Sequence, residues 1–274
     1  MTTHTLAQFE GPLLLVGAGK MGQAMLEGWL ARGLDPNKLA IVEPQPADSV
    51  QALAAQGVAL NPAALPKAGA IVIAVKPQTA AQAMPQLASS ATRDTLVISI
   101  MAGRTLAFLR RHMPAGAALV RAMPNTPAAI GRGITVACGS AEVTPQQRAL
   151  ASGLLEAIGS VEWVDDESLM DAVTALSGSG PAYVFLLAEA MAKAGIAAGL
   201  PPQLAQRLAR ETVAGSGELM HRSPLDAATL RQNVTSPGGT TAAALEILMG
   251  PNGFDRLLTE AIASATRRSR ELAG

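Results

Sequence analysis

The run Leu13-Leu14-Leu15-Val16-Gly17-Ala18-Gly19-Lys20-Met21-Gly22 decides the fold of this chain. Its four apolar residues predict a buried strand, and the following glycines have the Gly-x-Gly-x-x-Gly spacing of a dinucleotide-binding turn. In such a turn the first glycine makes the bend, the second admits a pyrophosphate, and the third lets the next helix pack closely. A glycine-rich turn without function is the alternative for the bare pattern, but its place between a strand and a helix favours nucleotide binding.

The residues beyond this run continue as short apolar strands separated by helices. Helices are expected at about 21–32 and 78–89. Continuous apolar strands joined in this way indicate a mostly parallel sheet covered on both faces. The further strands are expected at Leu39–Val42, Ala70–Val75, Thr95–Ser99, Ala118–Arg121, Ile134–Ala137 and Val161–Val164.

The β-rich pattern stops near Asp165. We therefore expect an α/β chain with an N-terminal Rossmann-like, mostly parallel sheet domain at 11–164 and an all-α domain at 165–274. Proline suits the first turn of a helix, which helps to place several helix starts. The expected helices are Glu167–Thr174, Pro181–Ala198, Pro201–His221, Pro237–Met249 and Gly253–Leu272.

Composition excludes several classes of function. Hydrophobic residues make up 49% of the 274 residues and charged residues 15%, which indicates a folded core rather than disorder. Basic and acidic residues both number 21, so net charge gives no support to nucleic-acid or membrane partners. The three histidines lie far apart, so no metal site is expected. A single cysteine, Cys138, and no secretory-signal pattern in the first eleven residues lead us to expect a cytoplasmic protein.

Glu43 directly follows the second expected strand, where Rossmann proteins recognise the adenosine ribose. A carboxylate there accepts a hydrogen bond from a ribose 2′-OH and repels a 2′-phosphate, which favours NAD over NADP. The closest cation in the sequence is Lys38, and no arginine lies nearby. The alternative is a solvated loop residue ahead of Pro44.

Two more expected strands end in short segments at the edge where open α/β sheets bind ligands. Ala74-Val75-Lys76-Pro77 supplies a cation and a rigid turn, and Ser99-Ile100-Met101-Ala102-Gly103 is small and flexible. Ordinary turns and cofactor contacts are equally good interpretations of these two segments.

A hydroxyl-rich and glycine-rich segment, Asn233 to Thr241, precedes the helix expected near Pro237. Free N–H groups at a helix start, together with hydroxyls, suit a small carboxylate. The alternative is a set of local roles, with Ser236 as a helix cap, Asn233 in a turn, and Thr240 and Thr241 as plain helix residues.

Motifs in this order along nearly the whole chain resemble those of pyrroline-5-carboxylate reductases. The segments that carry the resemblance are Val16–Gly22, Val75–Pro77, Arg121–Pro127, Asp171–Tyr183 and Val234–Thr241. The resemblance implies that a Rossmann domain precedes an all-α dimerisation domain, and that Δ1-pyrroline-5-carboxylate is reduced to L-proline with NADPH or NADH. It also implies a homodimer with interlocked helical domains, which in some members assembles further into a decamer.

The resemblance also implies roles for single residues. The nucleotide would contact Val16, Gly17, Ala18, Gly19, Lys20 and Met21, joined by Gly22 and Glu43 from the pattern above. Asn61 would lie near the adenosine ribose, and the nicotinamide side would be lined by Ala74, Val75, Lys76, Pro77, Met101 and Ala102. The substrate would fall to Glu167, Asn233, Ser236, Gly239, Thr240 and Thr241, in a site completed across the dimer interface. We expect the Thr241 hydroxyl to bind the ring nitrogen and to be the catalytic group.

Two other functions remain open at this point. A β-hydroxyacid dehydrogenase needs a lysine near the start of the helix expected from Pro181, but the first one there is Lys193, about three turns in. A non-catalytic nucleotide sensor would keep the glycine turn but would not need the hydroxyl-rich segment.

Overall fold

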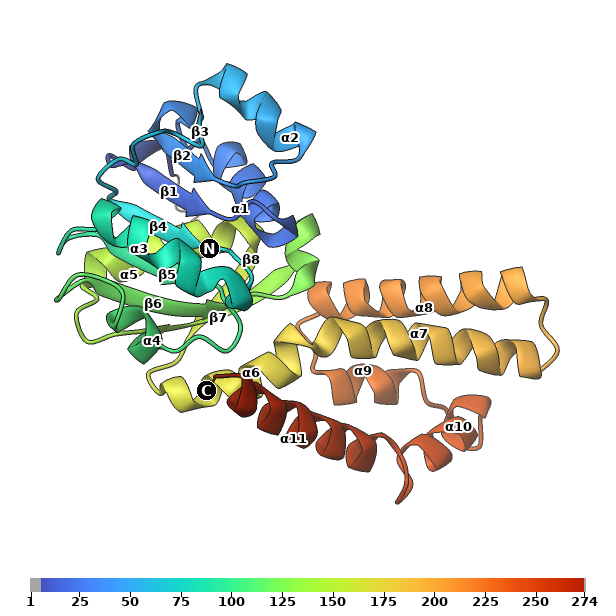
Figure 1. The fold of residues 1–274 in the computed structure, drawn as a ribbon. Coiled ribbons are helices and arrows are strands. Elements are labelled where there is room, and N and C mark those ends of the chain that lie inside the picture. The colour runs from blue at the N-terminus through green and yellow to red at the C-terminus, as the bar shows by residue number, and fades with distance from the viewer. Residues whose placement is uncertain (1–5, 274) are drawn as a thin grey trace. The chain divides into compact units, whose positions relative to one another are not determined.

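The computed structural model describes residues 6–273. Residues 1–5, part of the eleven-residue N-terminal segment in which no secretory-signal pattern was found, lie outside the described residues. Its centre is an eight-stranded sheet in the order β3-β2-β1-β4-β5-β6-β7-β8 (Figure 1). Every neighbouring pair of strands is parallel except β6 and β7, which are antiparallel. The strands are β1 (Leu13–Val16), β2 (Leu39–Val42), β3 (Ala59–Leu60), β4 (Ala70–Ile73), β5 (Leu96–Ser99), β6 (Ala118–Met123), β7 (Gly133–Gly139) and β8 (Gly159–Trp163).

Alternating residues of the strands build a hydrophobic core on each face of the sheet. Leu13 and Leu15 of β1 join a cluster with Trp29, whereas Leu14 joins the opposite cluster with Met84. The helices α1 (Lys20–Ala31) and α5 (Pro145–Leu155) contribute to the first cluster. The second cluster takes residues from α3 (Ala80–Ser90), α4 (Leu106–Arg110) and α6 (Met170–Val173). This confirms the expected α/β class with a mostly parallel sheet covered on both faces.

Some elements differ from the sequence-based expectation. Strand β4 ends at Ile73 rather than Val75, and the N–H of Ala74 donates to the carbonyl of Val16 at 2.7 Å, which draws this residue towards the glycine turn. Helix α5 was not expected, although a capping box of Thr144 and Gln147 starts it. The short α2 (Asp48–Gln51) was likewise not expected.

The C-terminal part is helical, as expected. Residues Glu167–Gly178 form a 3₁₀ turn, helix α6 and a π-helical turn in succession, rather than the single helix that the sequence indicated. Helices α7 and α8 then lie side by side (Figure 1). The remaining bounds are α7 (Gly180–Ala197), α8 (Pro202–Arg222), α9 (Ala227–Asn233), α10 (Thr240–Leu248) and α11 (Phe254–Ala273).

Helix α10 begins three residues later than the Pro237 start that the sequence indicated. Gly238 has a left-handed φ of +68°, and Gly239, with φ −80° and ψ 172°, is the N-cap. A left-handed residue cannot continue an α-helix, so the start moves to Thr240. Helix α9, which ends at Asn233, was not expected at all.

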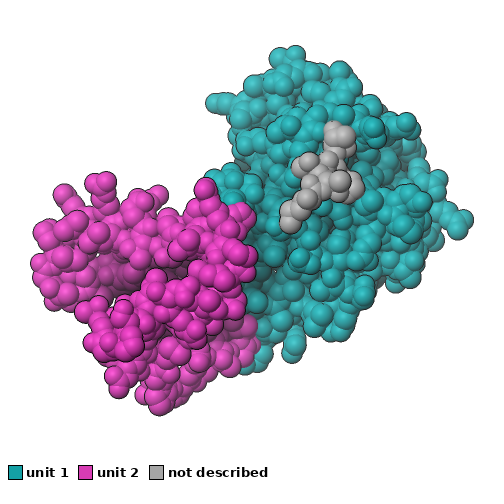
Figure 2. Space-filling view, turned by 180° about the vertical axis from the view of Figure 1, so that it is seen from behind, with its two compact units in different colours: residues 1–178, 265–274 teal, residues 179–264 magenta. Residues whose placement is uncertain are grey.

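Contacts within the chain group it into two compact units (Figure 2). One unit, called here the sheet unit, comprises residues 1–178 and 265–274, and the other, the helical unit, comprises residues 179–264. Met170 is buried in a core cluster of the sheet unit, and Ser269 donates to Asp171 at 2.7 Å, so both segments group with the sheet. The domain division expected after residue 164 stays a prediction.

The helical unit leaves most of its large apolar side chains exposed. Within its described residues the buried apolar side chains are three alanines, Ala192, Ala205 and Ala209. By contrast, Phe185 is 68% exposed and Ile247 is 78% exposed. Among residues 6–273, every helix is too short or too polar to cross a membrane. An exposed apolar surface of this size is typical of an interaction site.

Candidate active site

The glycine turn joins β1 to α1 in a conformation that depends on its glycines. Gly17 has φ +92°, and a Cβ built on it would lie 2.7 Å from the carbonyl oxygen of Ala74. A Cβ on Gly22 would clash with the carbonyl oxygen of Gly17, so this glycine lets the helix approach the turn. By contrast, a Cβ on Gly19 would meet nothing within 4 Å. The turn is therefore tight against the protein and open on its outer side, as a pyrophosphate requires.

The start of α1 offers backbone N–H groups to a ligand. Gly19 is the N-cap and supplies no side chain to the first turn. The side-chain amide of Gln23 donates to the carbonyl of Ala18 at 2.9 Å, which ties the helix to the turn. A helix start of this kind favours an anion.

Glu43 lies beside the turn at the end of β2. Its Oε2 accepts the N–H of Ala18 at 2.8 Å, and its Oε1 accepts the N–H of Gln45 at 3.0 Å. Asn61, the one non-glycine residue with positive φ (47°) among residues 6–273, pairs its side-chain amide with the backbone N–H and C=O of Glu43, both at 2.9 Å. The two residues that the sequence assigned to the adenosine ribose are thus in direct contact.

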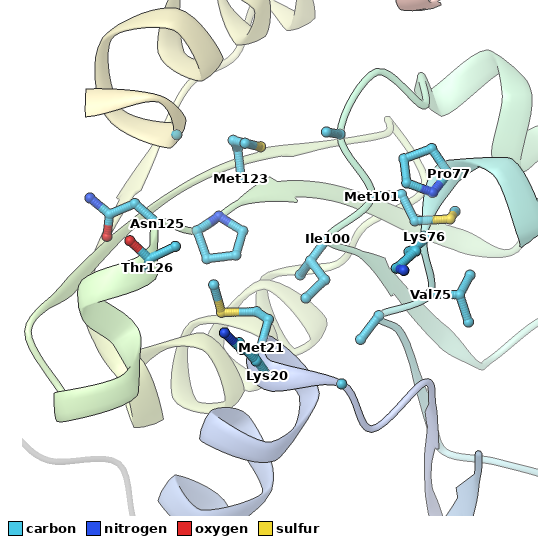
Figure 3. Close-up of a pocket in the computed structure, with 15 residues that line it drawn as sticks. Lys20, Met21, Val75, Lys76, Pro77, Ile100, Met101, Met123, Asn125 and Thr126 are labelled. Atoms are coloured by element: carbon cyan, nitrogen blue, oxygen red, sulfur yellow. The ribbon is translucent and has the colours of Figure 1, made fainter. Parts of the chain in front are cut away.

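A cavity of about 540 Å³ opens beside the turn (Figure 3). Its wall brings together segments from the ends of β1, β4 and β5: Gly19, Lys20, Met21, Ala74, Val75, Lys76, Pro77, Met101 and Ala102. The sequence assigned every one of these residues to the cofactor. A second cavity, called here the β2 cleft, measures about 650 Å³ and is lined by Val16, Gly17, Ala18 and Glu43 among others.

The rest of the first cavity's wall had no cofactor role assigned residue by residue, although Ile100 lies in the Ser99–Gly103 segment that the sequence singled out. Ile100 belongs to the segment after β5, and a second group follows β6. Asn125 of this group donates from its amide to the Ser177 hydroxyl at 3.3 Å and accepts the N–H of Ile134 at 3.0 Å. The rule that ligands bind at carboxyl ends of parallel strands could have found the segment. Besides Asn125, the lining residues that sequence reasoning missed are Met123, Pro124, Thr126 and Gly178.

Glu167, assigned to the substrate, lies outside the lining of this cavity. Its Oε1 accepts the N–H of Leu106 at 2.8 Å and a guanidinium N–H of Arg121 at 3.1 Å. Arg121 is only 4% exposed and also lies 4.0 Å from Asp171. An arginine within an apolar strand signals a buried acidic partner, and sequence reasoning did not use that signal.

Cys138 packs in the core of the sheet unit, as a small buried residue is expected to do. It is 1% exposed, and burial raises the pKa of its thiol, with the nearby Glu167 carboxylate adding to the rise. A neutral buried thiol is unreactive, so the geometry gives Cys138 a packing role.

The other residues assigned to the substrate lie in the helical unit. Asn233 ends α9, Ser236 lies in the connection, and Gly239 caps α10 without a side-chain hydrogen bond. Thr240 and Thr241 form the first turn of α10; Thr240 is exposed and Thr241 half-buried. Neither threonine hydroxyl makes a hydrogen bond within the described part of the chain, so the helix start keeps free donors.

Two family models match the chain. Residues 167–272 match the model described as pyrroline-5-carboxylate reductase dimerisation, and residues 13–103 match NADP oxidoreductase coenzyme F420-dependent. Together with the exposed apolar helices, the first match shows that the helical part forms an oligomer.

Curated relatives match over almost the full length. The chain is 40% identical to pyrroline-5-carboxylate reductase of Synechocystis, covering 94% of this chain and 97% of the relative. It is 38% identical to the enzyme of the same name from Pseudomonas aeruginosa, covering 95% and 96%.

Solved structures agree with these relatives. A pyrroline-5-carboxylate reductase from Coxiella burnetii superimposes with a TM-score of 0.88 at 32% identity, covering 96% of this chain and 99% of that one. Pyrroline carboxylate reductase from Plasmodium falciparum, solved with NADP bound, gives a TM-score of 0.79 at 27% identity, covering 97% and 99%. With the nucleotide turn, the lined cavity and the helical part described above, these matches establish that the chain belongs to the pyrroline-5-carboxylate reductase family.

Proposed function

We propose that this protein reduces the C=N bond of Δ1-pyrroline-5-carboxylate to L-proline, with hydride from NADPH or NADH. Its relatives carry that activity in their names over nearly the full length of the chain. The activity is the last step of proline biosynthesis.

The lining of the 540 Å³ cavity is the observation that carries this proposal. Among its lining residues the ionisable side chains are two ammonium groups, Lys20 and Lys76, with no carboxylate or imidazole. A hydroxyacid dehydrogenase would need its proton-transferring lysine near the start of α7, and neither Lys20 nor Lys76 lies on that helix. An imine nitrogen is basic enough to arrive partly protonated, so its reduction requires less acid catalysis. A largely apolar cavity with two cations therefore suits reduction of an anionic imine.

The cofactor would be held by the residues around the glycine turn and the two cavities. The chain's residues would bind and orient it: the open face at Gly19 for the pyrophosphate, Glu43 and Asn61 at the ribose, and Ala74–Pro77 with Met101 and Ala102 at the nicotinamide. Once bound, the reduced nicotinamide supplies the hydride.

The substrate would be bound at the start of α10. The N–H groups of Thr240 and Thr241 would hold the carboxylate, since the N–H of Gly239 already donates to the carbonyl of Ser236 at 3.0 Å. The Thr241 hydroxyl would hydrogen-bond the ring nitrogen as it becomes an amine. Asn233, Ser236 and Thr240 would complete the polar surface. For Glu167, Oε1 is already engaged by Leu106 and Arg121, which leaves Oε2 for the substrate.

We further propose a homodimer with interlocked helical domains, in which the substrate residues complete the partner's nicotinamide pocket, and assembly of such dimers into a decamer. The domains would be residues 11–164 for the dinucleotide and 165–274 for dimerisation and substrate. Exposed Phe185 and Ile247 support association. Buried, unpaired Cys138 is compatible with the cytoplasm.

Steady-state oxidation of NADH and of NADPH, with and without Δ1-pyrroline-5-carboxylate, tests the proposal. We expect turnover that depends on the imine, and no reaction of β-hydroxyacids with NAD⁺ or NADP⁺. A hydroxyacid enzyme would need a lysine near the start of α7, whereas the first lysine on that helix, Lys193, pairs with Glu189 at 2.6 Å on its exposed surface. Nucleotide binding without imine-dependent turnover would identify a sensor instead.

A further inference from the structure

The carboxylate of Glu43 is fixed in position rather than free in solvent. Each oxygen accepts one backbone N–H, Oε2 from Ala18 at 2.8 Å and Oε1 from Gln45 at 3.0 Å. The backbone of Glu43 is in turn fixed by the Asn61 amide. Glu43 therefore cannot rotate away from the glycine turn without breaking two charge-assisted hydrogen bonds.

This fixed carboxylate lies in the β2 cleft, beside the turn that binds the pyrophosphate in Rossmann folds. Each oxygen keeps acceptor capacity beyond its one N–H, so a ribose diol could donate to it. A 2′-phosphate would instead bring about 1.5 to 2 negative charges to the same carboxylate.

The cations near the cleft do not offset this charge. Among the described residues that line it, the charged ones are Glu43 and Lys76. Lys76 follows β4, and β1 with its glycine turn lies between β4 and β2. Lys38 lies at the opposite end of β2, where its ammonium group donates to the carbonyl of Phe9 at 2.5 Å.

We infer that Glu43 makes this protein select NADH over NADPH. The inference rests on the proposed function, because a preference between the two nucleotides matters to the protein only if one of them is its hydride donor. It departs from the NADP named for the matching oxidoreductase model and bound in the Plasmodium structure. Glu43 acts through the ribose end of the cofactor, away from the reacting atoms, so it sets specificity rather than chemistry.

Equilibrium titration with NADH and with NADPH, followed by nicotinamide fluorescence and without imine, tests the inference independently of turnover. The wild-type protein should bind NADH at least about tenfold more tightly, since like charges placed together are strongly unfavourable. In Glu43→Gln the two dissociation constants should approach within about threefold, mainly through tighter NADPH binding. The matched control Glu10→Gln removes the same charge just before β1, at the amino ends of the strands, whereas Glu43 follows the carboxyl end of β2. It should keep the wild-type ratio of the two dissociation constants.

A salt series on the wild-type protein gives a second measurement that needs no variant to fold. Raising NaCl from about 20 to about 500 mM screens repulsion, so the preference for NADH should narrow. If cations held the 2′-phosphate, added salt would weaken the binding of NADPH more than the binding of NADH. Equal or tighter wild-type binding of NADPH, an unchanged ratio in Glu43→Gln, or a preference that widens with salt would each overturn the inference. Loss of imine turnover with the NADH preference intact would count against the proposed function alone.

Discussion

The sheet unit and the helical unit of this chain differ in how far they bury their apolar residues. The sheet unit buries Trp29, Leu13 and Leu14 completely, within clusters on both faces of its sheet. The helical unit buries only alanines among its described apolar residues and exposes Phe185 at 68%. One unit therefore carries its own core, whereas the other needs a surface outside the chain to cover it.

This difference places cofactor binding and substrate binding, the two requirements of the proposed reaction, on different units. The groups assigned to the cofactor lie on the sheet unit, where one chain's packing fixes them. Most groups assigned to the substrate lie on the helical unit, which leaves most of its large apolar side chains exposed. Cofactor binding should therefore survive changes that abolish turnover, and the following predictions test that separation.

The largest expected effect is on the core of the sheet unit. Trp29→Ala empties a fully buried site and loses the indole N–H bond to the carbonyl of Leu154 at 2.8 Å. We expect urea unfolding of the sheet unit to show a loss of about 3–5 kcal/mol. Trp29→Phe keeps most of the volume and should cost only about 1–2 kcal/mol. A loss below about 1 kcal/mol for Trp29→Ala would mean that this unit does not depend on its own core.

The next effect concerns the helical unit. Thr241→Ala should lower kcat/KM for the imine by about 10- to 100-fold, since the ring nitrogen loses its hydrogen-bond partner. Nucleotide dissociation constants and the thermal midpoint should stay unchanged, because the Thr241 hydroxyl makes no hydrogen bond within the described chain. Thr259→Ala, on an exposed face of α11, is the control. Wild-type kcat/KM in Thr241→Ala would remove the hydrogen-bonding proposal.

A smaller effect separates nucleotide binding from stability. Gly19 has φ −68° and open space where a Cβ would be, so Gly19→Ala should leave the unfolding midpoint unchanged. Its methyl group would intrude on the pyrophosphate, and nucleotide affinity should fall by about tenfold. Gly215→Ala on α8 also meets nothing within 4 Å. That variant should bind nucleotide normally, and a change in its affinity would show that the helical unit contributes to cofactor binding.

The smallest effect is a pH dependence in the sheet unit. Burial raises the pKa of the Cys138 thiol in the folded state. Below the unfolded pKa of about 8.5 the thiol is neutral in both states; above it only the unfolded chain ionises, so stability falls as pH rises. We expect the free energy of unfolding to decline more steeply above about pH 9 in wild type than in Cys138→Ala, by at most about 1.4 kcal/mol per pH unit. Parallel profiles in urea titrations would contradict this.

Local pattern was enough to predict most of the sheet. Leu13–Val16 and Leu39–Val42 are continuous apolar runs, and their bounds agree with the structure. The start of α10 was misplaced because proline suits a first turn, whereas the left-handed Gly238 that follows overrides this preference. Helix α9 is short, and its Asp226 cap, which accepts the N–H of Thr229 at 2.8 Å, is a weak signal in isolation.

The candidate site was predictable where a residue type has a known role at a strand end. Lys76 comes three residues after the end of β4 and Met101 two residues after the end of β5, and both line the cavity. Asn125 was missed because its placement depends on the side-chain bond to Ser177, far away in sequence. The Arg121 contacts with Glu167 and Asp171 likewise depend on tertiary packing that no local pattern encodes.

The most direct test of the separation between cofactor binding and turnover uses Phe185→Asp, which places a charge on the exposed apolar surface of α7. The control is Ala141→Asp, at an exposed turn of the sheet unit. Sedimentation velocity, NADH titration and imine turnover are measured on the same preparations. We predict that Phe185→Asp is monomeric and loses at least about 100-fold in turnover, while its NADH dissociation constant stays within about threefold of wild type. A monomer that retains turnover, or a variant that loses NADH binding together with turnover, would contradict the account.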